Sequence, residues 1–320
     1  MDKKMRKSFS FLIKISISAG ILFFLFKRVD IGKIIQIITS ADKSILTLAF
    51  SLIILIYGIG FFRWRMLLVG LGINLPNSRI FKSFCIGFFF NLLFPSTVGG
   101  DVFRGIDLGI QTHKPKQAIA SVILDRLSGY TALVIVALFS LSLGYKHIKE
   151  ISVFLALGII VLGLIAALAV LFNHFLCIKV RKFLNFFGRA GEVLGNLHFE
   201  IYNFRTQKNI ILKNFLYSFI IQLIVPLTFY LICLSLGARI NPIYFFILVP
   251  IIATISALPI SIGGFGLREA SSIYFFVKVG VSAEIALTVS LLSFFMIFLS
   301  GIVAGVIYVI TFSTRRLQYN

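Results

Sequence analysis

Charged residues, and acidic ones above all, are scarce in this sequence. Only 13% of the 320 residues are charged, about half of the roughly 25% found in an average soluble domain, whereas 59% are hydrophobic. One water-soluble core of this size cannot bury so much apolar surface. The composition therefore excludes an ordinary soluble domain and predicts an all-α polytopic membrane protein.

Cysteine, histidine and proline are also rare, with 3, 4 and 7 residues. These numbers exclude a disulfide scaffold and a collagen-like or low-complexity chain. The cysteines and histidines are scattered, so the sequence predicts no metal site and no Ser–His–Asp or Cys–His constellation. It also lacks a Walker-type phosphate loop. We therefore expect no cofactor, and a transporter-like protein rather than an enzyme.

Lysine and arginine, in contrast, are abundant. They number 31 against 11 acidic residues, which gives a net charge of +20. In a soluble protein this surplus would indicate nucleic acid. In a membrane protein the concentration of basic residues on the cytoplasmic side explains it, and the same cations attract anionic lipid headgroups. We therefore expect membrane lipids as partners and no nucleic acid.

Long apolar runs predict six full membrane spans. The first run follows a basic N-terminus, but no small-residue cleavage site comes after it, so we expect an uncleaved span rather than a signal peptide. The last run is long enough to be tilted. The six runs are residues 8–26, 44–62, 127–145, 151–173, 214–238 and 285–314.

Two further apolar runs, residues 83–100 and 240–267, each contain a proline followed by a glycine pair, which interrupts a helix. If the first run enters the membrane and returns, most Lys and Arg residues lie on one face, which is then cytoplasmic. We therefore expect two re-entrant broken hairpins. Both termini are expected in the cytoplasm, and the protein in the cytoplasmic (inner) membrane.

The two broken runs share one sequence frame. Residues 95–104 and 259–268 both read Pro-x-(Ser/Thr)-(Val/Ile)-Gly-Gly-x-x-(Phe/Leu)-Arg. Each half of the chain, about 8–145 and 151–312, consists of two spans, a hairpin and a third span. Three spans per half is an odd number, so we expect an inverted repeat within a single integral membrane domain, 1–320. A chance or purely structural match is the alternative.

Backbone that is not helical must, inside a membrane, be buried in protein or line a polar cavity. The interrupting residues therefore predict a cavity where the two hairpin tips meet. A half-helix that begins after each glycine pair would direct free N–H groups at this cavity and favour an anion such as phosphate. The interrupting residues are Pro95, Gly99 and Gly100 in the first run and Pro259, Gly263 and Gly264 in the second.

Arg104 and Arg268 occupy the same place in the two repeats, and we expect them to bind a phosphate as bidentate donors. The alternative is that each anchors its hairpin by snorkelling. Asp101 either caps the following helix and pairs with Arg104, or contacts the substrate. Glu269 is expected to take part of this role in the second half, where Phe265 replaces the aspartate.

Asp125 and Arg126 lie where the third full span is expected to begin, and such charges are costly near hydrocarbon unless they are paired or face a cavity. Neighbouring residues do not face each other on a helix, so we expect separate partners, with Arg104 as the partner of Asp125. A helix-end ion pair that serves folding alone is the alternative. Asn91, one helical turn before Pro95, is expected to cap or line the first hairpin.

Two further segments have simpler predicted roles. Residues 174–213 carry basic residues among Phe and Leu, which predicts an amphipathic helix on the cytoplasmic surface, with docking of a partner enzyme as the alternative. Gly301 and Gly305 form a small-xxx-small pair in the last span. We expect this pair to permit close packing within the bundle rather than dimerisation.

Three segments resemble the lysylphosphatidylglycerol synthase transmembrane region, also called the flippase-like domain. They are Asn91-Leu-Leu-Phe-Pro-Ser-Thr-Val-Gly-Gly-Asp-Val-Phe-Arg104, Asp125-Arg-Leu-Ser-Gly129 and Pro259-Ile-Ser-Ile-Gly-Gly-Phe-Gly-Leu-Arg-Glu269. The resemblance covers nearly the whole chain in the right order. It implies an inner-membrane protein related to the module that moves aminoacylated phospholipid between leaflets. The chain ends at Asn320, soon after the last expected span, so synthesis of the lysyl lipid by a soluble domain is not implied.

The residues and the resemblance together predict a lipid flippase or scramblase. Its substrate is expected to be an anionic, aminoacylated or sugar-linked lipid, either a phospholipid or a polyprenyl-linked lipid. Two alternatives stay open. One is a membrane-embedded transferase that acts on a lipid-linked donor, and the other is a non-catalytic partner of a glycosyltransferase or another cell-envelope enzyme.

Overall fold

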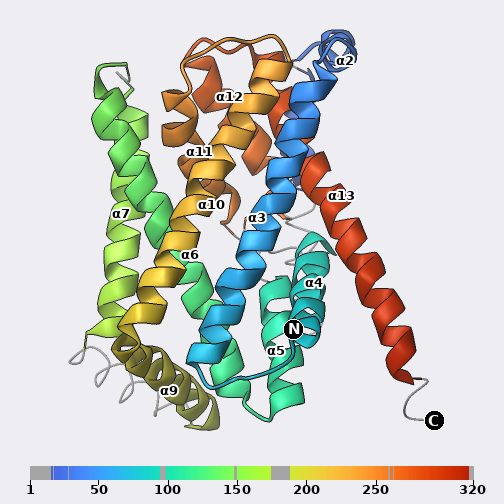
Figure 1. Cartoon of the computed structure of the whole chain (residues 1–320). Coiled ribbons are helices and arrows are strands. Elements are labelled where there is room, and N and C mark those ends of the chain that lie inside the picture. Colours follow the sequence, from blue (N-terminus) through green and yellow to red (C-terminus); the bar gives the residue numbers. More distant parts are fainter. Residues whose placement is uncertain are drawn as a thin grey trace.

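A computed structural model describes residues 16, 18–27, 29–93, 99–147, 150–173, 188–258, 260–261 and 263–316, and regular structure in these residues is helical throughout (Figure 1). Five of the helices are long and apolar enough to cross a membrane. They are α3 (Lys43–Gly70), α6 (Pro115–Gly144), α7 (Ile151–Phe172), α10 (Lys208–Ser235) and α13 (Ala283–Arg316). The predicted class of all-α polytopic membrane protein is therefore confirmed.

Short elements connect the long helices. A helix at Ser18–Lys27 is apolar but short, and residues 8–15 of the first expected span lie outside the described residues. The same is true of residues 174–187 in the predicted amphipathic loop, whose remainder contains the helix α9 at the lower end of Figure 1. The connecting elements are α2 (Ile31–Thr39), η1 (Tyr145–His147), α9 (Gly188–Asn203) and η2 (Phe204–Thr206).

The two interrupted runs form helical hairpins. The first consists of α4 (Asn77–Leu93) and α5 (Gly99–Thr112), and the second of α11 (Ile243–Ser256) and α12 (Leu267–Val277). At 1.5 Å per residue these arms are roughly 17 to 26 Å long, less than the roughly 30 Å of a bilayer core. Figure 1 shows α4 and α5 in the lower half of the molecule and α11 and α12 in the upper half. The two breaks expected from proline and glycine are therefore present.

Two long helices extend well beyond the predicted spans. The helix α6 begins at Pro115, although the sequence predicted a span from residue 127, and α3 ends at Gly70, although its span was predicted to end at residue 62. As a result, Asp125 and Arg126 lie in the interior of α6 and not at its entry. Charged residues marked the ends of the predicted spans, but a helix continues through such residues when they have partners in the bundle.

Packing brings the hairpins against helices from the other half of the chain. The helix α4 packs on α13, α11 packs on α6, and α3 packs along α10. A Cβ atom on Gly301 would lie 2.1 Å from Leu92 Cδ1, and one on Gly305 would lie 2.4 Å from Phe89 Cδ2. These two glycines therefore let α13 approach α4 closely, and the prediction that they pack within the bundle is confirmed.

Candidate functional site

A cavity of about 540 Å³ lies where the two hairpins meet the long helices. Residues from both hairpins line it, together with residues from α3, α6, α10 and α13. Ligand pockets in proteins typically measure about 300 to 1,000 Å³, so this cavity has room for a small polar group. Its charged, amide and serine side chains are Arg63, Asn91, Asp101, Arg104, Asp125, Arg126, Gln222, Ser256 and Arg268.

Five of the charged residues form one chain of ion pairs. Arg63 Nε lies 2.7 Å from Asp125 Oδ1, and Arg104 Nη2 lies 2.8 Å from Asp125 Oδ2. Arg104 Nε lies 3.1 Å from Asp101 Oδ1, and Arg126 pairs with the other oxygen of Asp101. The chain thus alternates in charge and connects α3, α5 and α6. Asp125 and Arg126 have separate partners, and Arg104 is a partner of Asp125, as the sequence predicted.

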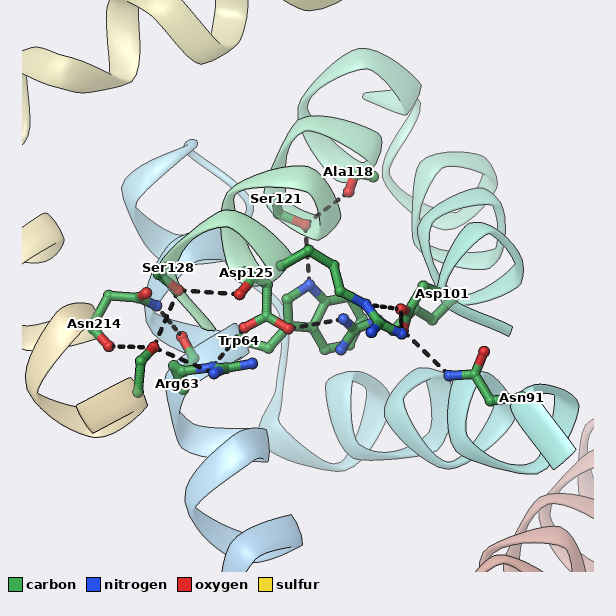
Figure 2. Close-up of polar contacts among 12 residues, drawn as sticks. Arg63, Trp64, Asn91, Asp101, Ala118, Ser121, Asp125, Ser128 and Asn214 are labelled. Carbon is green, nitrogen blue, oxygen red and sulfur yellow. Dashed lines mark hydrogen bonds and ion pairs between the residues drawn. The ribbon is translucent and has the colours of Figure 1, made fainter. Parts of the chain in front are cut away.

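Neutral side chains hold this charged chain in place. The Arg104 guanidinium lies 4.5 Å from the centre of the Trp64 ring, whose Nε1–H donates to Ser121 at 3.0 Å. Arg63 Nη1 donates to Ser218 on α10 at 3.2 Å. Figure 2 shows Trp64, Asp101 and Asp125 converging from α3, α5 and α6. Aromatic and hydroxyl partners of this kind reduce the cost of charges inside a membrane.

Asn91 joins the two arms of the first hairpin. The N–H group of Gly100, in the first turn of α5, donates to Asn91 Oδ1 at 2.9 Å. A Cβ atom on Gly100 would lie only 1.9 Å from the carbonyl oxygen of Gly87, so no larger residue fits there. Asn91 both caps α5 and lines the cavity, which were its two expected roles. Asp101 is an ion-pair partner of Arg104, and the cap is Asn91.

Arg268 has an equivalent set of partners in the second hairpin. Its Nε donates to Glu269 Oε1 at 2.9 Å and to Ser290 Oγ at 3.2 Å. Its guanidinium lies 4.6 Å from the centre of the Phe294 ring. Glu269 is fully buried and also accepts the N–H of Gly266 at 2.7 Å. Glu269 therefore neutralises Arg268, as expected from its position in the sequence.

The two repeat arginines thus have similar surroundings. Each lies beside a carboxylate and an aromatic ring, and each donates to an acceptor on the following long helix. That acceptor is Asp125, 21 residues after Arg104, in the first half and Ser290, 22 residues after Arg268, in the second. The acceptor is thus a carboxylate in the first half and a hydroxyl in the second, so the first half contributes more charged residues to the site.

The glycine pairs differ in structure although they match in sequence. Gly263 and Gly264 have φ values of 56° and 82° and form the turn before α12, where a side chain would be strained. Gly99 and Gly100 already belong to α5. In addition, Asn91 accepts the N–H group of Gly100, and Glu269 accepts the N–H group of Gly266. These two N–H groups, at the starts of the two half-helices, are therefore bonded and not free, contrary to the expectation. Pro95 and Pro259 lie outside the described residues.

Sequence reasoning missed Arg63 as a site residue and placed it at the cytoplasmic end of its span. The structure places Arg63 inside α3, where only 14% of its side chain is exposed. One signal was present, because the apolar sequence Met66-Leu-Leu-Val69 follows it and extends the span. In the part of the chain that the structure describes, no His, Cys, Asp and Glu cluster could hold a metal ion.

Five membrane-length helices, two short hairpins and a charged cavity between them define a multi-pass membrane protein with a polar site in its interior. Residues 11–305 match the family described as the lysylphosphatidylglycerol synthase TM region, and the chain belongs to that family. It is also 26% identical over 293 residues to the UPF0104 membrane protein PH1989 of Pyrococcus horikoshii, with 82% of this chain and 85% of that protein covered. The family predicted from the three sequence segments is therefore confirmed.

Proposed function

We propose that this protein moves a lipid with a phosphate-bearing headgroup, anionic or sugar-linked, between the leaflets of the cytoplasmic membrane. The observation that carries the proposal is the cavity at the junction of the two hairpins, which four arginines and two aspartates line. A polar headgroup gains ion pairs there, while the hydrocarbon tails stay in the bilayer. The same cavity is lined by Tyr57, Phe88 and Tyr130, whose aromatic rings provide a surface for the glycerol or sugar part.

An inverted repeat provides the route to both leaflets. The proposal is supported by the opposite ends at which the two hairpins lie in Figure 1. It is also supported by the packing, because the hairpin of each half contacts the last long helix of the other half: α4 packs on α13, and α11 packs on α6. In transporters with this plan, rocking of one half against the other exposes a central site alternately to the two sides. No energy source is required for such a movement down a gradient.

Arg126 and Arg268 are the proposed headgroup ligands. The Arg126 side chain is 36% exposed, whereas that of Arg104 is 5% exposed and lies between Asp101, Asp125 and Trp64. A phosphate therefore reaches Arg126 without displacing the central pairs. We assign Arg104 a positioning role, in which it holds Asp101 and Asp125 at fixed places beside the cavity.

The proposed orientation places the lower end of Figure 1 in the cytoplasm. That end contains the turn between α5 and α6, the helix α9 and the start of α10, and it carries Arg79, Lys82, Lys114, Lys116, Arg205 and Lys208. The positive-inside rule assigns such an end to the cytoplasm. With an additional span before α2, both termini are cytoplasmic, and the loop 174–213 lies on the same side.

A liposome assay tests the proposed function. The full chain is reconstituted in vesicles with nitrobenzoxadiazole-labelled phosphatidylglycerol, and dithionite added outside bleaches only the outer leaflet. We expect bleaching beyond one half of the label with the wild type. Arg126→Gln and Arg268→Gln are expected to slow the additional phase about tenfold or more, because each removes a charge-assisted phosphate contact.

Arg239→Gln is the matched control, because Arg239 is exposed in the connection between α10 and α11, away from the cavity lining. It is expected to behave as the wild type. Bleaching that stops at one half with every preparation would contradict the proposed movement of lipid. A chemically altered lipid would indicate a transferase, and a co-purifying envelope enzyme without lipid movement would indicate the non-catalytic partner.

A further inference from the structure

The cavity has a neutral polar part in addition to its ion pairs. Tyr57 on α3, Tyr130 on α6 and Gln222 on α10 line it, and all three side chains are half-buried. Phenol and amide groups donate and accept hydrogen bonds without carrying a charge. They are therefore suited to the hydroxyl groups of a ligand.

This neutral part lies one to two helical turns beyond the arginines. The side chain of Lys114, just before α6, donates to a carbonyl oxygen just after α3, so the end of α3 and the start of α6 lie together. Tyr57 comes six residues before Arg63 on α3, and Tyr130 comes four residues after Arg126 on the same face of α6. At 1.5 Å per residue, both tyrosines are displaced in the same direction by roughly 6 to 9 Å. A headgroup held at Arg126 through its phosphate therefore reaches them with the group beyond the phosphate.

The two tyrosines have hydrogen-bonding capacity left for a ligand. Among the residues that the structure describes, neither the Tyr57 nor the Tyr130 hydroxyl has a hydrogen-bond partner. A tyrosine hydroxyl that is withdrawn from water normally has one. The Tyr57 ring is also fixed against α4, because its centroid lies 4.0 Å from that of Phe88. A ligand with hydroxyl groups would supply the partners.

Gln222 adds an acceptor at the same level. Its Nε2 donates to the carbonyl oxygen of Gly129, the residue before Tyr130, at 3.3 Å. A carbonyl oxygen only accepts, so this bond determines which way the amide is turned. Within the described part of the chain no donor reaches Gln222 Oε1. This oxygen is therefore available to the O–H group of a ligand.

We propose that Tyr57, Tyr130 and Gln222 form a subsite for a polyhydroxylated headgroup, the glycerol or sugar that follows the phosphate of the lipid. This inference rests on the proposed function and specifies its substrate class. Neighbouring hydroxyl groups donate to Gln222 and accept from the phenols, while the aromatic rings pack on the C–H groups. A headgroup without hydroxyl groups leaves these side chains unpaired, and a site of this kind discriminates strongly against such an analogue.

The first experiment compares lipids of equal charge that differ in their hydroxyl groups. Phosphatidylglycerol, phosphatidylinositol and phosphatidylethanol each carry one negative charge, but only the first two have hydroxyl groups beyond the phosphate. The purified full chain is incubated with equal amounts of the three in an amine-oxide detergent, which has no hydroxyl groups, and native mass spectrometry counts the bound lipids. We expect at least one hydroxylated lipid to be retained about tenfold over phosphatidylethanol, because it makes additional hydrogen bonds. Equal retention of all three, or a preference for phosphatidylethanol, would overturn the inference.

Variants that remove single polar groups assign the preference to these side chains. Tyr57→Phe and Tyr130→Phe each remove one hydroxyl and keep the ring. Each is expected to lower the preference for the hydroxylated lipid about threefold, and the double variant to remove most of it, because the hydrogen bonds are lost. Gln222→Met keeps the length of the side chain without the amide and is expected to act like one tyrosine change. Retention of phosphatidylethanol should stay as in the wild type.

Tyr217→Phe is the matched control, because Tyr217 lies on α10, is exposed and does not line the cavity. It is expected to keep the wild-type preference. An unchanged preference in the double tyrosine variant would contradict the subsite. Equal loss of all three lipids, with an altered size-exclusion profile, would assign the tyrosines a structural role and contradict it as well.

Two further arms separate this inference from its alternatives. Glycerol and methyl glucoside are added at millimolar concentrations, and displacement of the lipid by either would indicate a site for a soluble polyol and contradict the lipid assignment. In the liposome assay, equal movement of acyl-labelled phosphatidylglycerol, phosphatidylinositol and phosphatidylethanol would contradict the inference and leave the proposed function standing. Selective retention in detergent without movement in liposomes would contradict the function and leave the subsite standing.

Discussion

Asp125 holds two arginines that come from different helices, Arg63 from α3 and Arg104 from α5. It is almost fully buried, so its charge depends on these two partners rather than on water. Burying an ion pair is costly in itself, but removing one member of a formed pair costs more, because the other charge stays behind without compensation. Asp125 therefore carries more of the stability of the bundle than a surface carboxylate does.

We expect Asp125→Asn to destabilise the protein by about 3 to 5 kcal/mol, because Arg63 loses its carboxylate partner and Arg104 keeps only Asp101. The measurement is the thermal unfolding midpoint in detergent. Glu150→Gln is the control, because Glu150 pairs with Lys278 at an exposed position and its loss should change the midpoint little. Equal midpoints for the two variants would show that the buried chain of pairs adds no stability.

At the scale of a single residue, the sequence predicted the pairing of Asp125 with Arg104 but not the depth of either residue. Neighbouring charges in an apolar run imply separate partners, which is a local rule that holds in any bundle. How deep a residue lies in the bundle depends on where its helix begins. The helix α6 begins at Pro115, ten residues before Asp125, so Asp125 and Arg126 both lie within it. Arg63 was missed for the same reason, since hydropathy alone ends a span at the first charged residue.

At the scale of a helix, the close approach of α4 and α13 stabilises the bundle through packing. Gly301 lies against Leu92, and Gly305 lies against Phe89, so the glycines of one helix receive the large side chains of the other. Small residues permit this kind of packing in membranes, where there is no hydrophobic driving force between helices. The contact joins the last long helix to the first hairpin and thereby closes one side of the bundle (Figure 1).

We expect Gly301→Val to separate α13 from α4 and to destabilise the bundle by about 1 to 3 kcal/mol, because the added atoms overlap Leu92. The second change Leu92→Ala makes room and should recover part of this loss, as measured by thermal unfolding of the single and double variants. Gly163→Val on α7 is the control, because a Cβ atom there has no neighbour within 4 Å. Purely additive effects of the two changes would contradict the contact.

The secondary structure of the elements was partly predictable. Proline followed by a glycine pair correctly marked both hairpin tips, because each residue type disfavours a continuous helix. The sequence frame did not reveal that Gly99 and Gly100 open α5 whereas Gly263 and Gly264 form a turn. Backbone angles depend on the close neighbours, here Gly87 in one hairpin and Ser256 in the other, and these come from tertiary packing.

For the whole molecule, the class and the family followed from composition and three short segments, because the bilayer restricts the choice of fold more strongly than water does. Orientation follows from charge, and the proposed arrangement has the α5–α6 turn in the cytoplasm and the α10–α11 connection outside. These two connections lie at opposite ends of Figure 1. The proposed inverted repeat requires this placement.

Cysteine labelling measures the orientation directly. In a variant without native cysteines, Arg239→Cys is expected to react with a membrane-impermeant maleimide in intact spheroplasts, because the proposed orientation places it outside. Lys116→Cys is expected to react only after lysis, because the proposed orientation places it in the cytoplasm. Both native side chains are exposed, so accessibility does not limit either reaction. Labelling of both positions from the same side would contradict the inverted arrangement.

The contact between Gly100 and Gly87 limits how such a molecule moves. Backbone atoms of the two arms are so close that a single methyl group would not fit, and Asn91 ties the arms together by a hydrogen bond. Separation of the two arms would break this hydrogen bond and the close backbone contact. If the protein moves lipid as proposed, we therefore expect the first hairpin to shift as one unit and the opening for a headgroup to form between this hairpin and the neighbouring helices.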